Sequence, residues 1–124
     1  MINKRRAIKK VLEDEFTVYD IGILDKDAYL SLPFVVLSII EERHLMRSHF
    51  ITFSVYVYAS IKTPLILDDC EKKIKMLLHK KRIKSDEGAF FVEYTGTTLD
   101  FINMKINAEM GALAKVIEFK IPLI

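Results

Sequence analysis

Histidine is the residue type that would first suggest a metal site in this chain, and its spacing does not favour one. The three histidines are His44, His49 and His79. The segment EERHLMRSH, which contains the first two, matches no ligand spacing for a metal ion. We therefore expect surface histidines at a turn and at a helix end, and no metal site.

Cys70 is the only cysteine, which excludes an intrachain disulfide and suits a reducing cytosol. A nucleophilic cysteine needs a nearby base and a positively charged setting. Here the neighbours in sequence are Asp68, Asp69 and Glu71, and carboxylates that lie close to a thiol raise its pKa. The sequence predicts a buried, structural thiol.

General acid–base catalysis would need carboxylates positioned together with a base or a nucleophile. Glu41-Glu42 is expected at a polar strand end, and Asp68-Asp69 at a helix start, where acidic residues favour the helix dipole. The four glycines are scattered and build no phosphate-binding loop. We predict no catalytic residue, no cofactor and no enzymatic activity.

Two basic segments, NKRRAIKK (3–10) and HKKRIK (79–84), are the best indication of a nucleic-acid partner. Basic residues on one helix face, including Lys4, Arg5 and Lys9, would contact phosphates without reading a sequence. Acidic residues one turn later would balance this charge, and the net charge is only +2. Because no recognition-helix motif is present, a DNA-facing surface and a merely solvated helix face both remain open.

Hydrophobic periodicity predicts the elements that must position these residues. Helices are expected over residues 3–16, capped by Asn3, and over 63–82, whose apolar face is Leu67, Cys70, Ile74, Leu77, Leu78 and Lys81. Strands are expected over 17–21, 33–45, 49–61, 89–95 and 113–123, with a loop over 22–32 and a tight connection over 46–48. Residues 96–111 are expected to form an extended hairpin arm or a mobile loop.

This order predicts a single α+β domain over residues 1–124, an antiparallel sheet of about four to five strands with two helices packed on one face. Apolar residues make up 51% of the chain, which is high for a small domain and favours an oligomer. No apolar run is long enough to span a membrane, and the N-terminus lacks the apolar stretch of a signal peptide.

The strand HFITFSVYVYASI (49–61) has apolar residues at every odd position from Ile51 to Ala59, as expected for a buried face. Its other face carries Phe50, Tyr56 and Tyr58. Since aromatic residues are enriched at interfaces, these three are predicted to contact a neighbouring subunit. We expect Tyr56→Ser or Tyr58→Ser to impair assembly more than it lowers monomer stability.

Six segments, taken in their order along the chain, form a layout that can be compared with known families. The segments are AIKKVLEDEF (7–16), VYD (18–20), LPFVVLSI (32–39), ITFSVYVYAS (51–60), LDDCEKKIKMLL (67–78) and MGALAKVIEFKIPL (110–123). This layout, which covers nearly the full chain, resembles the phage tail-completion, or tail-terminator, family of small ring-forming proteins.

The resemblance implies a non-enzymatic virion component of the tail or neck, assembled in the cytoplasm of a bacterial host. Such subunits form a ring, typically a hexamer, that caps the tail tube and helps join the tail to the head. The implied partners are further copies of the chain, the tail-tube protein and the head–tail connector protein, with no membrane and no sequence-specific nucleic acid.

Residues 96–111 suit contact with a neighbour, because Phe101, Ile102 and Met104 lie in an otherwise polar segment. The alternative function is a small cytosolic regulatory or nucleic-acid-binding domain that uses segments 3–10 and 79–84.

Overall fold

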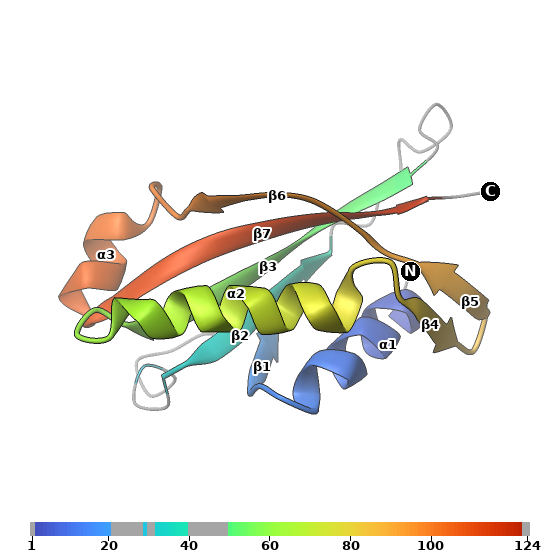
Figure 1. Ribbon diagram of the computed structural model, residues 1–124, viewed down its shortest axis with the longest axis horizontal. Coiled ribbons are helices and arrows are strands. Elements are labelled where there is room, and N and C mark those ends of the chain that lie inside the picture. Colours follow the sequence, from blue (N-terminus) through green and yellow to red (C-terminus); the bar gives the residue numbers. More distant parts are fainter. Residues whose placement is uncertain (1, 21–28, 30–31, 40–49, 123–124) are drawn as a thin grey trace.

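The computed structural model describes residues 2–20, 29, 32–39 and 50–122. The helices are α1 (Ile2–Glu13), α2 (Pro64–Leu78) and α3 (Met104–Glu109). The strands are β1 (Val18–Asp20), β2 (Phe34–Ile39), β3 (Phe50–Ser60), β4 (Arg82–Ser85), β5 (Gly88–Phe91), β6 (Glu93–Leu99) and β7 (Ala112–Pro122). Figure 1 shows α1 and α2 lying across one face of a long sheet, with α3 at one end and the β4–β5 hairpin toward the other.

The main sheet has the strand order β1-β2-β3-β7-β6, and β4 and β5 form a separate two-stranded sheet. The central strand is β3, which pairs antiparallel with β2 on one side and with β7 along its full length on the other. This pairing sets Phe53 opposite Phe119, and their rings stack with centroids 5.2 Å apart. The alternation read in the sequence therefore places the odd residues of β3 on one buried face.

The main core lies between this face and the helices. It contains Ile8 and Leu12 of α1, Leu67, Cys70, Ile74 and Leu78 of α2, Ile83 and Phe90 of the hairpin, and inward residues of β2, β3 and β7. The α+β class and the packing of α1 and α2 on one face are thus confirmed. The apolar stripe of α2 is as predicted, except that Lys81 lies beyond the helix end.

The sheet is mixed, whereas the sequence predicted an antiparallel one. Strand β1 runs parallel to β2, with Val18 opposite Val35 and Asp20 opposite Leu37. A parallel pair requires the chain to return to the same end of the sheet through a long connection. The stretch over residues 21–33 supplies that length, and periodicity within each strand does not reveal its direction.

The chain between residues 82 and 111 departs most from the prediction. Residues 89–95 belong to two strands in different sheets, β5 and β6, with buried Val92 between them. Of the two alternatives for residues 96–111, the hairpin arm holds as far as Leu99, because β6 pairs antiparallel with β7. The rest of this segment contains the helix α3, which was not predicted. Part of the basic segment 79–84 forms β4, because the chain leaves α2 after Leu78 and Lys80 adopts a positive φ of 58°.

Other boundaries differ by a few residues. Helix α1 begins at Ile2, so Asn3 lies within its first turn and is not its cap. The described part of the second predicted strand ends at Ile39, and the connection over 46–48 lies outside the described residues.

Candidate functional site

The outer face of the sheet, opposite α1 and α2, carries an aromatic cluster formed by Tyr19, Tyr29, Phe34 and Tyr58. The rings of Phe34 and Tyr58 stack with centroids 4.7 Å apart and planes 14° apart. Tyr29 meets both rings edge to face, and Tyr19 meets Phe34 in the same way. Tyr58 is therefore only 7% exposed, and this burial raises the pKa of its hydroxyl.

This packing changes the interpretation of the three aromatic residues of β3. Side chains of the same chain cover the Tyr58 ring, so no neighbouring subunit is needed to bury it. Tyr56 is half-buried against the same cluster. Phe50 is exposed at the far end of the strand, about 26 Å from Tyr58 at the usual strand rise, with the Lys120 ammonium 5.6 Å from its ring centroid. The three residues do not form one continuous patch.

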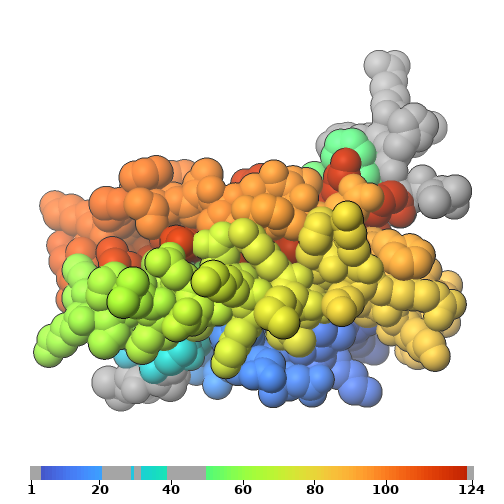
Figure 2. All heavy atoms as spheres, in the orientation of Figure 1, coloured from blue at the N-terminus to red at the C-terminus, as the bar shows by residue number. Residues whose placement is uncertain are grey.

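A second group of apolar side chains is left uncovered around α3. We call this group the α3 patch; its members are Leu99, Phe101, Ile102, Met104 and Ile106. Ile102 is 94% exposed, Phe101 67% and Ile106 59%. Figure 2 shows the atoms of this segment, in orange, gathered at one end of the molecule. The sequence predicted that Phe101, Ile102 and Met104 contact a neighbouring subunit; all three are exposed in the subunit, and the contact itself stays a prediction.

The sequence prediction missed Leu99 and Ile106. The available signal was that Leu99 and Ile106 are apolar residues of the same polar segment as Phe101 and Ile102. The connection from β3 to α2 lies at the same end, because the Ile61 amide donates to the carbonyl of Gly111 at 2.9 Å. This connection adds the exposed side chain of Ile61, and the first turn of α2 adds those of Leu65 and Ile66.

A buried polar cluster holds the α3 segment onto the sheet. Asn103 Nδ2 donates to both carboxylate oxygens of Asp100 at 3.3 and 3.2 Å, and Asn107 Nδ2 donates to Asp100 Oδ2 at 3.4 Å. Tyr29 OH donates to Asn107 Oδ1 at 3.5 Å, and the Asp100 amide donates to the Ala114 carbonyl of β7 at 3.0 Å. Asp100 and Asn107 are both buried. The cluster therefore supports the α3 patch from beneath.

The cluster is not a ligand site. The space beside Asp100 and Asn107 is about 10 Å³, roughly the volume that one water centre needs. No organic ligand fits there. Among the residues that the structure describes, no group of three or more histidine, cysteine or acidic side chains could hold a metal ion.

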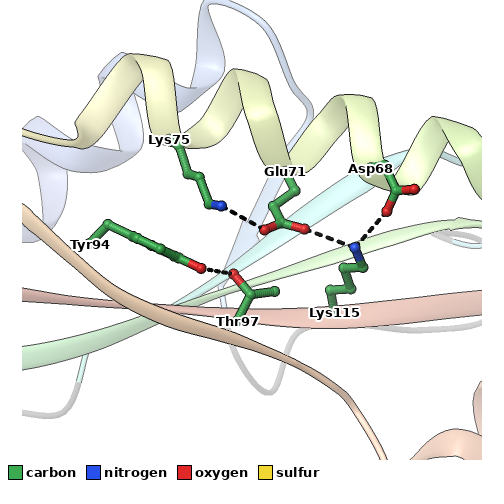
Figure 3. Close-up of polar contacts among 6 residues, drawn as sticks. All are labelled: Asp68, Glu71, Lys75, Tyr94, Thr97 and Lys115. Carbon is green, nitrogen blue, oxygen red and sulfur yellow. Dashed lines mark hydrogen bonds and ion pairs between the residues drawn. The ribbon is translucent and has the colours of Figure 1, made fainter.

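Charged side chains between α2 and the sheet form a network centred on Glu71 (Figure 3). Lys115 Nζ lies 2.8 Å from Glu71 Oε1 and 2.6 Å from Asp68 Oδ1, and Lys75 Nζ lies 2.9 Å from Glu71 Oε2. Burial alone would raise the pKa of Glu71, but hydrogen bonds from Lys115, Lys75 and Thr97 outweigh it and lower the pKa to about 2. A carboxylate held charged by two ammonium groups is a structural clamp and not a proton donor at neutral pH.

The cysteine and histidine side chains that could be reactive or bind a metal ion are next, and those that the structure describes make structural contacts. Cys70 is buried in the core, and burial raises the pKa of its thiol, in line with the structural role predicted for it. His79 Nδ1 accepts a hydrogen bond from the Tyr94 amide at 2.9 Å. His44, His49 and Glu41-Glu42 lie outside the described residues.

The basic residues predicted to face DNA are engaged by carboxylates of this chain. Arg5 lies 2.7 Å and Lys9 3.5 Å from the two carboxylate oxygens of Asp20, and Lys4 lies 3.8 Å from Glu87. All three side chains are partly buried. They lie on one side of α1, and contact with phosphate would require them to exchange these partners.

None of the described helices is both long and apolar enough to cross a membrane. No protein-family model matches the chain, and no curated protein matches it.

Proposed function

We propose that this chain is a structural subunit of a ring that caps a phage tail tube and helps join the tail to the head. The proposal is carried by the α3 patch, a group of exposed apolar side chains in the segment that the sequence singled out for contacts with a neighbour. The tail-terminator layout read in the sequence supports it, and the α+β fold agrees with that layout.

The α3 patch has the physical properties of a contact surface. Burial of apolar surface contributes about 25 cal/mol per Å², so covering side chains as exposed as Ile102 and Phe101 would favour association. The patch lies on the end of β6, the turn after it and α3, and the hydrogen bond between Asp100 and Asn107 ties this turn to α3, so little ordering is needed on binding. The start of α2, which carries the exposed Leu65, lies at the same end of the molecule as α3 (Figure 1).

The position of the patch suits a ring. A closed ring is built from heterologous contacts, in which one surface of a subunit meets a different surface of the next. The α3 patch lies at one end of an elongated molecule, and the β4–β5 hairpin lies toward the other end (Figure 1). A contact that uses the α3 patch therefore need not be self-complementary.

The test is assembly with and without a phage tail-tube protein. Light scattering across a range of concentrations and negative-stain microscopy would measure ring formation and tube capping. We expect the double variant Phe101→Asp/Ile102→Asp to abolish assembly. Met76→Asp is the control, because Met76 is an apolar residue of α2 that is 74% exposed and lies outside the α3 patch.

Two results would contradict the proposal. One is a wild-type chain that stays monomeric at every concentration and leaves tube length unchanged. The other is a double variant that assembles as the wild type does.

A further inference from the structure

An open basic groove runs along the junction of α1 with β4. Two adjoining depressions of about 230 and 350 Å³ make up this groove. Its basic side chains are Arg6 and Lys10 from α1, Lys81 from the turn after α2, and Arg82 and Lys84 from β4. All five are exposed. The fold thus brings the two basic segments of the sequence together at one surface.

The groove uses the side of α1 that Lys4, Arg5 and Lys9 do not. Arg6 and Lys10 are four residues apart and therefore lie on one helix face. Within the described part of the chain, no ion pair joins a carboxylate to any of the five groove cations, whereas Arg5 and Lys9 share Asp20. Asp14 and Asp86 also line the groove, which leaves it net positive. The repulsion among these cations would be relieved by an external anion.

The chemistry of the groove favours an extended polyanion over a single small anion. Lysine is a flexible point charge, and the groove cations are spread over three segments instead of converging on one spot. The row of phosphates along a nucleic-acid backbone matches this spread of cations. The release of counterions from the phosphates would favour binding. An acidic peptide offers similar charges but is normally held by an apolar anchor pocket or a strand edge as well.

The floor of the groove indicates which nucleic acid fits. Its apolar residues, among those described, are Ala7, Val11, Leu77 and Ile83. They include no aromatic ring, and single-strand binding depends on bases that stack on aromatic side chains. Aliphatic walls beneath lysine and arginine heads suit contact with the backbone of a duplex, whose bases remain stacked.

We propose that the basic groove, Arg6, Lys10, Lys81, Arg82 and Lys84, binds the phosphate backbone of duplex DNA without sequence recognition. The proposal is independent of the ring function, because the groove and the α3 patch are formed by different segments.

Fluorescence anisotropy with a labelled duplex of about 20 base pairs tests the proposal over a salt series from roughly 50 to 200 mM. The test variant is Lys10→Gln/Lys81→Gln/Lys84→Gln. The matched control is Lys62→Gln/Lys72→Gln/Lys105→Gln, which removes the same charge from exposed lysines outside the groove. We expect the test variant to bind at least tenfold more weakly at the lowest salt, with a log–log salt slope shallower by about 3. The control should retain most of the wild-type affinity.

Equal losses in the two triple variants would overturn the proposal, because the interaction would then follow net charge alone. No binding by the wild type at the lowest salt would overturn it too. A polyglutamate peptide that binds the groove while the duplex does not would assign the groove to an acidic protein. Should the test variant be unfolded by circular dichroism, Arg6→Gln/Arg82→Gln, at two exposed positions, makes the same comparison.

Discussion

Two groups of large apolar side chains lie outside the main core, and they differ in how far the chain itself covers them. The aromatic cluster of Tyr19, Tyr29, Phe34 and Tyr58 lies on the outer face of the sheet, where three strands and residue 29 supply neighbours for each ring. The α3 patch lies at the end of the sheet, on the turn that leads into α3 and on α3 itself, and its side chains are exposed to solvent.

The comparison shows that an apolar residue in an unexpected place does not by itself mark an interface. Tyr58 is surrounded by side chains of its own chain and is 7% exposed, whereas Ile102 is 94% exposed. The first contributes to the free energy of unfolding of the subunit, and the second is available to stabilise an assembly. Substitutions in the two regions should separate the contribution to subunit stability from the contribution to assembly.

The largest effect is expected when the aromatic cluster is opened. Tyr58→Ala removes a ring that stacks on Phe34, and deletion of a buried aromatic side chain costs about 3 to 5 kcal/mol. Urea denaturation would measure the loss. This reverses the expectation from the sequence that Tyr58 substitutions act mainly on assembly. Phe50→Ala, at an exposed position of the same strand face, is the control and should cost under about 1 kcal/mol. Equal costs would mean that the cluster is not packed.

A smaller effect is expected at the link between the two regions. Asn107 accepts a hydrogen bond from Tyr29 of the aromatic cluster and donates to Asp100 beneath the α3 patch. Asn107→Ala should cost about 2 kcal/mol, because buried polar partners lose their hydrogen bonds. Hydrogen exchange should increase over residues 104–110 but not over α2. Uniform exchange along the whole chain would contradict this local anchoring role.

The Glu71 network provides a stability contribution that depends on charge and not on apolar packing. The pKa of Glu71 is lowered in the folded chain, so its contribution is fully present above the unfolded value of about 4.5 and is lost as the pH falls toward about 2. Glu71→Gln should cost about 1 to 2 kcal/mol near neutral pH. The wild type should therefore lose more stability than this variant between pH 6 and pH 2. Parallel pH profiles would show that Glu71 is not the group responsible.

The smallest effect on stability is expected at the α3 patch. Ile102→Ser removes a side chain that is exposed, so the free energy of unfolding should change by no more than about 0.5 kcal/mol. A thermal or urea denaturation curve that coincides with that of the wild type, together with loss of assembly, would complete the contrast with Tyr58. A large fall in stability would instead show that Ile102 packs within the subunit.

Elements with a strong local period were predictable from the sequence. The alternating apolar residues of β3 and the apolar stripe of α2 pack in the same core. The sequence pattern of each element therefore agrees with its environment. The apolar residues Phe101, Ile102 and Met104 could be singled out as well, because apolar residues in a polar segment are visible without knowing its secondary structure. Their contact with a neighbour stays a prediction. The helix α3, which begins at Met104, was not predictable, since so short a helix has almost no period to detect.

The rest depended on contacts between residues distant in the sequence. The sequence by itself determined which residues of β3 and α2 are apolar on one side, that no disulfide can form within the chain, and that charge is concentrated in segments 3–10 and 79–84. Only the tertiary structure decided that the ring of Tyr58 stacks on Phe34 and that Asp20 pairs with Arg5 and Lys9. It likewise decided that Lys10 and Lys84 line the same groove. The physical reason is that periodicity reports how a segment orients its side chains, whereas the partner that covers or neutralises a side chain comes from another segment.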